Sequence, residues 1–356
     1  MLSNTVPTIP SDVTVAFSWN GLPQYAARLL RAAVRDLNRP CPVIGSRPAV
    51  PVEGMEDALG QPILWIDPEQ ATSWSALGLG VPSVFFQSGW NSPAFNALGD
   101  EVRHAGGRVI GMSDANFRGD FRQLVLGAVW FRLRYRSRFD AMIVPGTSGN
   151  RLMRYFGLAR DRIFQGMYGA DPALFQPGPA LAERAPRFLF VGQFIPRKGV
   201  MELCTAFSRF RRKHPEWELE VIGSGPLKDN LPRTDGIQIR DFVQPSQLGA
   251  HFDAARFFVL PSHVEAWGLV VHEAALAGCG LLLSTAIGSA EDFADSATLR
   301  FKPGSVDAIE RTLENAAALS KADLDRLQQI SLAKAQDFGP ERFARTAIAA
   351  IARVMS

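Results

Sequence analysis

Cysteine is scarce in this chain of 356 residues, which has only Cys41, Cys204 and Cys279, far apart and without paired spacing. This distribution excludes a disulfide framework and a zinc motif, and it favours a reducing compartment. Long apolar runs are absent as well, since none approaches the ~20 residues that span a bilayer. The N-terminus lacks the basic start and apolar stretch of a signal peptide. We therefore expect a cytoplasmic protein.

A large net charge and internal repetition are also missing. The 38 Lys and Arg residues nearly balance the 35 Asp and Glu residues, and the net charge of +3 is too small to indicate a nucleic-acid partner. No repeat with a solenoid period and no low-complexity tract occurs. With 47% hydrophobic and 21% charged residues, the composition is that of an ordinary globular protein.

The chain does contain a regular alternation of strand-like and helix-like segments. Apolar strand-like runs lie at 13–19, 62–66, 84–87, 109–112 and 141–144 in the first half, and at 188–191, 219–222, 237–242, 257–260 and 281–284 in the second. The segment 24–37 is typical of the helices between them. A chain of this length usually exceeds one core, so we predict an α/β protein of two Rossmann-like, doubly wound domains facing an interdomain cleft.

Glycine and proline gather between the two halves, from Met167 to Pro179. A linker there predicts an N-terminal domain over residues 1–170 and a C-terminal domain over residues 180–339. The remaining segment, 340–356, is typical of an amphipathic helix that packs on a domain surface. Its apolar face carries Phe343, Ala347, Ile351 and Val354.

Two glutamates flank a glycine at a strand-to-helix junction in the second half. The apolar run 257–260 ends at Pro261, and helix-forming residues resume at Leu269. The free amides of such a helix start attract a diphosphate, and they belong here to Gly268, Leu269 and Val270. One of Glu265 and Glu273 could then accept hydrogen bonds from sugar hydroxyls and the other from ribose hydroxyls. The alternative is that both are ordinary solvated surface glutamates.

A second element of this kind lies upstream, where the run 187–191 is followed by a glycine turn and a pair of cations. Gly192 allows close backbone approach of a ligand at the carboxyl end of the strand, next to Gln193. Arg197 and Lys198 stand before the next helix, and either could neutralise a diphosphate. Taken alone, basic residues in such a place are usually solvated surface groups.

In this order and spacing, the two elements resemble the retaining family-four glycosyltransferases of the GT-B fold, over about residues 187–293. Gly223-Ser224-Gly225-Pro226 agrees with the same pattern. The resemblance implies that Lys198 holds the donor diphosphate, that Glu265 contacts the transferred sugar and that Glu273 holds the ribose. Together with Arg197, which could share the charge of the diphosphate, Lys198 and Glu265 are the predicted catalytic residues. The predicted donor-binding residues are Gly192, Gln193, Val243, Gly268, Leu269, Val270, Glu273 and Gly21. The family often has arginine where this chain has Gln193, so either Arg197 shares that charge or the diphosphate is held less tightly.

The resemblance also implies the substrates. It implies a nucleoside-diphosphate sugar donor, bound by the C-terminal domain, and a glycan, glycolipid or small-molecule acceptor, bound by the N-terminal domain. It further implies that the last helix crosses back to the N-terminal domain. Because cations and helix amides already cover the diphosphate, we expect no cofactor and no essential metal. Two alternatives stay open: a non-catalytic nucleotide-sugar-binding protein, and a sugar-nucleotide epimerase of similar architecture.

Three features of the N-terminal half are less specific. Gly21 follows the first strand and opens a helix, so it could meet the donor or simply form the turn. Asp114 and Asn116 follow another strand and are predicted acceptor-side groups, with helix capping as the alternative for Asp114. Six arginines within Arg118–Arg138 surround an apolar stretch with Trp130. They could bind an anionic membrane surface, on the inner face of the membrane, or surround a core helix.

Overall fold

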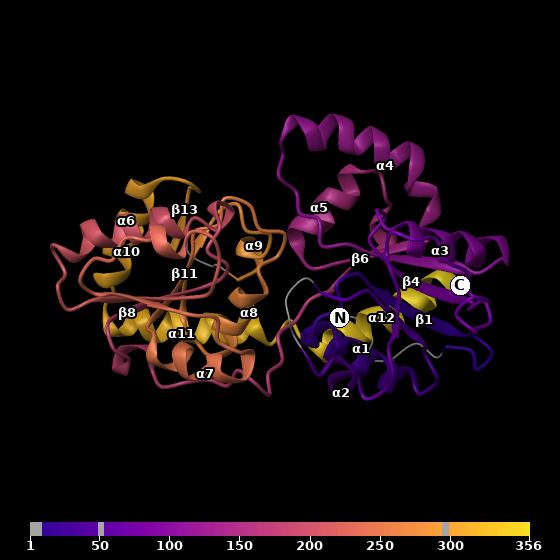
Figure 1. Cartoon of the computed structure of the whole chain (residues 1–356), viewed down its shortest axis with the longest axis horizontal. Coiled ribbons are helices and arrows are strands. Elements are labelled where there is room, and N and C mark those ends of the chain that lie inside the picture. The colour runs from indigo at the N-terminus through magenta and orange to yellow at the C-terminus, as the bar shows by residue number, and fades with distance from the viewer. Residues whose placement is uncertain (1–8, 49–52, 294–298) are drawn as a thin grey trace. The chain divides into compact units, whose positions relative to one another are not determined.

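The computed structural model describes residues 9–48, 53–293 and 299–356. The chain forms two compact units: unit 1 comprises residues 1–169 and 338–356, and unit 2 comprises residues 170–337 (Figure 1). The chain therefore passes between the units twice, at 169–170 and at 337–338, and its last helix belongs to unit 1. Among the helices of the described residues, none is long and apolar enough to cross a membrane.

Unit 1 is built on one parallel sheet, with seven strands in its described residues. In spatial order the strands are β3 (Leu64–Trp65), β2 (Val43–Gly45), β1 (Val15–Trp19), β4 (Val84–Ser88), β5 (Arg108–Met112), β6 (Ala141–Val144) and β7 (Ile163–Gln165). The order reverses between β1 and β4, which is the arrangement of a doubly wound fold. Phe17 of β1 stacks on Phe86 of β4, with 4.4 Å between ring centroids.

Helices cover both faces of this sheet. One face packs against α1 (Gln24–Leu37), α2 (Met55–Leu59) and α12 (Pro340–Met355), and the other against α3 (Pro93–His104), α4 (Ala128–Arg134) and α5 (Thr147–Tyr155). A π-helix, Arg122–Gly127, leads directly into α4. Phe343, Ala347 and Ile351 of α12 are fully buried in the core shared with α1, so the last helix completes unit 1.

Unit 2 has a second parallel sheet, with six strands in its described residues. Their order is β10 (Ile237–Arg240), β9 (Glu218–Ile222), β8 (Arg187–Val191), β11 (Phe257–Leu260), β12 (Gly280–Ser284) and β13 (Arg300–Phe301). The helices are α6 (Val200–Arg211), α7 (Pro245–Ala254), α8 (Leu269–Leu276), α9 (Ala290–Phe293), α10 (Val306–Ala317) and α11 (Lys321–Ala335). α6 and α10 pack together on one face, and α7, α8 and α11 lie on the other.

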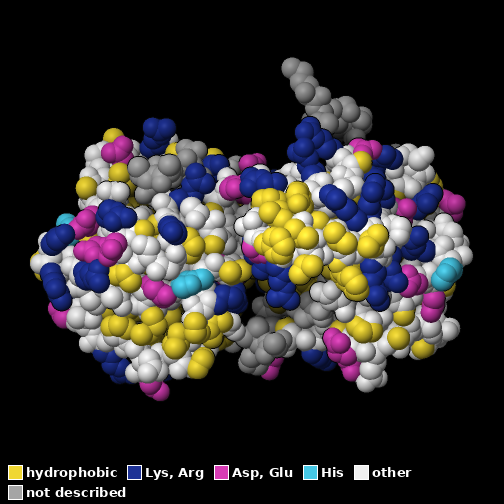
Figure 2. Space-filling view, turned by 90° about the horizontal axis from the view of Figure 1, so that it is seen from above, with side chains coloured by type: hydrophobic (Ala, Val, Ile, Leu, Met, Phe, Trp, Pro, Cys, Tyr) yellow, Lys and Arg dark blue, Asp and Glu magenta, His cyan; other side chains and the backbone are white. Residues whose placement is uncertain are grey.

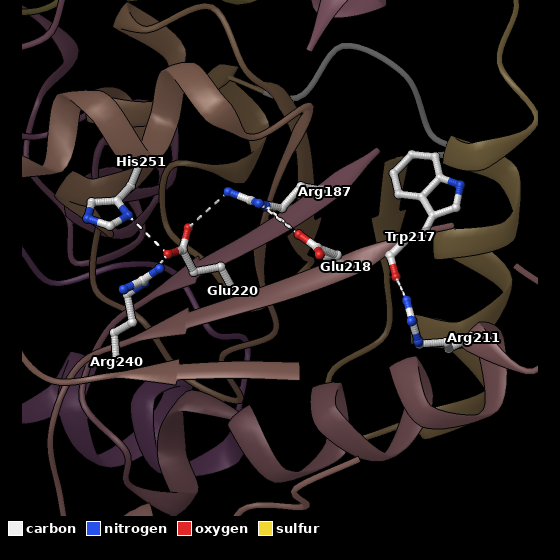
Figure 3. A network of polar contacts seen from close by, with 7 residues as sticks. All are labelled: Arg187, Arg211, Trp217, Glu218, Glu220, Arg240 and His251. Atoms are coloured by element: carbon white, nitrogen blue, oxygen red, sulfur yellow. Dashed lines mark hydrogen bonds and ion pairs between the residues drawn. The ribbon is translucent and has the colours of Figure 1, made fainter. Parts of the chain in front are cut away.

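A polar cluster ties the β10 edge of this sheet to α7 (Figure 3). The Glu220 carboxylate of β9 is only 1% exposed, and it accepts a hydrogen bond from Arg240 of β10 and lies 3.1 Å from Nδ1 of His251. Arg187 of β8 approaches the same carboxylate at 3.9 Å and binds Glu218 at 2.7 Å. Losing one partner of such a buried cluster leaves an uncompensated charge, so the cluster holds β8, β9 and β10 in place.

Candidate functional site

Three loops of unit 2 meet at one edge of its sheet. They follow β8 (residues 192–199), β9 (223–226) and β11 (261–268). Because β8 is hydrogen-bonded to β9 on one side and β11 on the other, and all three are parallel, their carboxyl ends share that edge. In open parallel sheets this is the edge at which ligands bind.

The loops after β8 and β9 are in backbone contact. Gly223 has φ of +154°, and a Cβ there would overlap the carbonyl oxygen of Gly192. Beyond it, the Phe194 amide donates to the carbonyl of Ser224 at 2.7 Å, and the Leu227 amide donates to the carbonyl of Phe194 at 3.0 Å. A Cβ at Gly225 would come within 2.6 Å of that same Phe194 oxygen. Glycine is therefore required here because two main chains approach each other too closely for any side chain.

The loops after β8 and β11 are joined in the same way. Gly199 has φ of +68°, and a Cβ there would overlap the carbonyl oxygen of Pro261. The His263 amide donates to the Arg197 carbonyl at 2.8 Å, while the Arg197 guanidinium donates to the Val264 carbonyl at 3.2 Å. These contacts bring the cationic pair of one loop beside Glu265 of the other.

Lys198 and Glu265 form the central contact of this edge. The Lys198 ammonium donates to Oε2 of Glu265, and each side chain is only 13% exposed. Arg197 lies 3.6 Å from the same oxygen, and the Ser262 hydroxyl donates to it at 3.4 Å. The backbone of Glu265 is fixed as well, because its carbonyl accepts from Gly288 at 3.0 Å. The two predicted cations and the predicted sugar-contacting carboxylate thus lie together in one cluster.

Helix α8 begins beside this cluster. Its N-cap is Gly268, with φ of +83°, and the Cβ of a side chain there would stand 3.2 Å from Cγ of Glu265. The Val271 amide is bonded back to the Gly268 carbonyl at 2.9 Å. Within the described part of the chain, no acceptor is bound to the amides of Leu269 and Val270. The helix start therefore presents free donors and the positive end of its dipole, which together favour an anion.

Glu273 lies one turn further along α8. It keeps part of its surface exposed, but the protein packs around it closely enough that burial raises the pKa of its carboxyl to about 7. Near neutral pH this group therefore exists in both protonation states. The ionised state accepts hydrogen bonds on both oxygens, as suits the two hydroxyls of a ribose, whereas the protonated state donates from one of them.

We expect Glu273 to make stability depend on pH. Its pKa in the folded protein exceeds its ordinary value of 4.5, so folding binds a proton, and stability falls as pH rises from 4.5 to about 7. The full effect is about 3 kcal/mol. Glu273→Gln should therefore raise the melting temperature relative to wild type more at pH 8 than at pH 5, whereas Glu183→Gln on the exposed surface should not. An equal effect of Glu273→Gln at both pH values would contradict the assignment.

The other predicted residues of unit 2 lie around the same edge. The Gln193 side chain is exposed in the loop after β8. Val243 is partly buried in the loop after β10, and that loop lies close to Gly223 because the Gly223 amide donates to the Arg240 carbonyl at 3.1 Å. Trp267 is buried against Phe293, so it is part of the core.

Two histidines near the glutamates have structural partners. His272 is buried, its Nδ1 accepts from the Ala170 amide at 2.8 Å, and its Nε2 lies 2.9 Å from the Ala335 carbonyl, to which it donates. Burial lowers the pKa of this imidazole to about 4. His263 contacts Glu202 of α6 at 3.0 Å. Both rings are thus engaged by other groups of unit 2.

Unit 1 has a polar pocket of about 290 Å³ at the carboxyl ends of β1, β4 and β5. Asp114 lines it, and its carboxylate accepts a hydrogen bond from Tyr168 at 3.2 Å. The other walls mix indole rings with amide and hydroxyl groups, which suits a polyhydroxylated ligand. They include Trp19, Asn20, Ser88, Trp90, Asn91 and Ser113.

Gly21 and Asn116 lie outside the lining of this pocket. The Gly21 amide donates to the Ser46 hydroxyl at 2.7 Å, so it is already satisfied within unit 1. The Asn116 carbonyl accepts from the Gln123 side chain at 2.8 Å. Tyr168 and Trp90 were not singled out from the sequence. Tyr168 falls in the predicted linker, and only its aromatic side chain could have indicated a role in ligand binding.

Comparisons with known proteins agree with this geometry. Residues 175–330 match the family model of "Glycosyl transferases group 1". Glycogen synthase of Mycobacterium tuberculosis is 31% identical over 167 residues, which are 43% of this chain and 39% of that protein. The chain thus spans less than half the length of this relative.

Two other proteins align with most of the chain. A GDP-mannose-dependent alpha-(1-6)-phosphatidylinositol monomannoside mannosyltransferase of Mycolicibacterium smegmatis is 25% identical over 84% of this chain and 79% of its own length. The crystal structure of Anabaena HepE, in complex with UDP and glucose, superposes with a TM-score of 0.70 at 12% identity, covering 94% of this chain and 98% of that one. The resemblance and the GT-B fold predicted from the sequence are thereby confirmed.

Proposed function

We propose that this chain, which has the GT-B fold and whose second unit matches the group 1 glycosyl transferases, is a retaining glycosyltransferase. It would move a sugar from a nucleoside-diphosphate sugar to a glycan, a lipid-linked acceptor or a small molecule. Such reactions occur in polysaccharide and glycoconjugate biosynthesis. The observation that carries the proposal is the meeting of Lys198, Arg197 and Glu265 beside the free amides of α8.

The main energetic problem of glycosyl transfer is the charge that develops on the departing diphosphate. Lys198, Arg197 and the amides of Leu269 and Val270 form a fixed set of donors for that charge. Donors held in place in a partly buried site stabilise a transition state more than the same groups in water, because they do not have to reorient. Lys198 is 13% exposed, which satisfies this condition.

The contact between Lys198 and Glu265 is compatible with this role. An ammonium has three donors, so Lys198 can keep its bond to Glu265 and still donate to a phosphate oxygen. The Glu265 carboxylate then lies beside the sugar, where a negative charge favours an oxocarbenium-like transition state. In the proposed step, the bond from the anomeric carbon to the diphosphate breaks while the acceptor hydroxyl attacks from the same face. The hydroxyl proton passes to the departing phosphate oxygen.

The polar pocket of unit 1 is the proposed acceptor-binding element. Asp114 is the only carboxylate among the described residues that line it, and a carboxylate next to aromatic rings is well suited to sugar hydroxyls. The similar proteins differ in their donors, since one is named for GDP-mannose and another holds UDP and glucose. A panel of donors is therefore needed to identify the nucleotide base and the sugar that this chain uses.

We propose that the enzyme needs no cofactor and no essential metal, because protein cations and backbone amides balance the negative charge of the diphosphate. The protein would act in the cytoplasm, and on the inner face of a membrane when the acceptor is a glycolipid. We expect turnover to survive an excess of chelator. A complete loss that Mg²⁺ restores would contradict this part of the proposal.

The direct test is sugar transfer from a panel of nucleoside-diphosphate sugars to sugar and glycolipid acceptors, followed by mass spectrometry. The expected result is one donor that yields a glycosylated acceptor and free nucleoside diphosphate, with NMR showing the anomeric configuration of the donor in the product. Conversion of the donor sugar without an acceptor would indicate an epimerase instead. Donor binding without turnover across the whole panel would indicate a non-catalytic binding protein.

A further inference from the structure

The segment 121–133 of unit 1 exposes an unusual amount of apolar surface. Its exposed side chains are Phe121, Val125, Leu126, Val129, Trp130 and Leu133, which we call the 121–133 face. They are six of the eleven large hydrophobic side chains that are exposed in the described residues. Leu133 is 81% exposed, Phe121 75% and Leu126 60%. Soluble surfaces seldom gather so many large apolar groups, and such a patch usually marks an interaction site.

The apolar groups lie on one side of a helix. Residues 126, 129, 130 and 133 follow the spacing that places side chains along one helical face. The opposite side is core, since Ala128 and Phe131 are buried and Phe131 stacks on Phe156 with 4.9 Å between centroids. In Figure 2, a broad hydrophobic area on unit 1 is flanked by Lys and Arg side chains.

Basic side chains border the 121–133 face. The sequence from Phe121 to Phe139 contains no acidic residue. Arg118 is paired with Asp120 at 3.2 Å and Arg138 with Asp100 at 3.0 Å. No ion pair forms with the other four arginines anywhere in the described residues. These are Arg122, Arg132, Arg134 and Arg136, all exposed.

Hydrogen bonds anchor the 121–133 face to the rest of unit 1. The Gln123 side chain is buried beneath the π-helix, where its Oε1 accepts from the Arg118 amide at 2.8 Å and its Nε2 donates to the Asn116 carbonyl at 2.8 Å. At the other end, Arg132 donates to the Tyr155 carbonyl at 2.6 Å. The apolar side chains thus project from an anchored helix, so their exposure is a property of the folded unit.

A hollow of about 890 Å³ opens beside the same face. Val125, Leu126, Val129 and Trp130 form part of its wall, and Leu152 and Phe156 lie deeper in its lining. Arg118, Arg122 and Asp120, which pairs with Arg118, also line it. An apolar hollow bordered by arginines has the chemistry of a lipid-binding surface, in which chains meet the apolar wall and anionic headgroups meet the cations.

We propose that the 121–133 face docks on an anionic lipid bilayer. Exposed apolar side chains with exposed arginines beside them are what an interfacial helix needs, because the apolar groups enter the acyl region while the cations stay among the headgroups. A second copy of this chain is a poorer partner. In a two-fold contact through this face, the arginines of each copy would meet those of the other.

The test is sedimentation of the full chain with vesicles of phosphatidylglycerol and phosphatidylcholine, beside vesicles of phosphatidylcholine alone. We expect binding to the anionic vesicles that falls steeply with added salt. Leu126→Glu combined with Leu133→Glu should weaken it ~tenfold or more, because two anchoring side chains are lost and two negative charges added. Val81→Glu, at a valine that is 43% exposed elsewhere on unit 1, is the matched control and should bind like wild type.

A charge variant separates the two contributions. Arg122→Ser combined with Arg134→Ser should weaken binding to the anionic vesicles and reduce its salt dependence, with little effect on the apolar contact. Equal binding by all variants, or no binding to either vesicle, would overturn the proposal. So would a concentration-dependent dimer of wild type in analytical ultracentrifugation that Leu126→Glu abolishes. The donor-induced thermal shift of unit 2 should be the same in wild type and in every variant. If no protein showed this shift while vesicle binding persisted, the proposed function would fail and the docking proposal would stand.

Discussion

Lys198→Ala is expected to lower the rate of sugar transfer by about 10²–10³-fold, the usual effect of losing one fixed donor to a developing oxyanion. The lysine is only 13% exposed and lies next to Glu265, so water cannot fully replace it. Its removal leaves Arg197, which lies 3.6 Å from the same carboxylate oxygen. The loss should appear in donor binding as well as in kcat, because the same ammonium holds the diphosphate in the ground state and the charge there is greatest in the transition state.

A matched lysine far from this edge provides the control. Lys213 is exposed and pairs with Glu314 at 2.7 Å, so Lys213→Ala removes one surface ion pair from the same unit. Its rate of transfer should equal that of wild type. If Lys198→Ala retained more than half of the wild-type kcat while folding normally, Lys198 would not be the diphosphate ligand.

Gly199→Ala is expected to destabilise unit 2 by about 3 kcal/mol and to abolish donor binding. The backbone at Gly199 has φ of +68°, which costs an L-residue about 1 kcal/mol. The added Cβ would also overlap the Pro261 carbonyl, and relieving such an overlap costs a further ~1–3 kcal/mol. Relief requires the loops after β8 and β11 to separate, which moves Lys198 away from Glu265.

Gly78→Ala isolates the backbone contribution. Gly78 has nearly the same φ, +69°, but a Cβ there would meet no atom within 4 Å. This variant should lose about 1 kcal/mol, as expected for the dihedral angle alone. Thermal or urea unfolding of both variants measures the difference. Equal destabilisation by the two substitutions would show that the contact between the loops does not constrain the site.

The sequence predicted the long strands and both halves of the donor edge for physical reasons. Four or five consecutive apolar residues, as in β8 and β11, are typical of parallel strands buried on both faces. Three short strands were not predicted, namely β2 and β7 with three residues each and β13 with two, although the two residues of β3 fall within the predicted run 62–66. So few residues carry no periodicity, and pairing with neighbouring strands decides their structure.

The chemistry of the site was only partly accessible from the sequence. The residue types at Lys198 and Glu265 indicated a diphosphate and a sugar, but their direct contact depends on loops that only the folded sheet brings together. The raised pKa of Glu273 follows from burial, which a helical position does not reveal. The arginines and apolar residues around Trp130 could not be assigned to a buried or an exposed helix face from the sequence. The π-helix before α4 changes which of these side chains face outward.

The most direct test of this account is a thermal-shift measurement with a panel of nucleoside diphosphates and their sugars, on wild type, Lys198→Ala and Glu273→Ala. A ligand at a hundred times its dissociation constant stabilises a fold by ~2.7 kcal/mol. We predict a shift of wild type with one nucleotide, lost in both variants. The absence of a shift with every nucleotide, or an equal shift in all three proteins, would contradict a nucleotide-sugar site at this edge of unit 2.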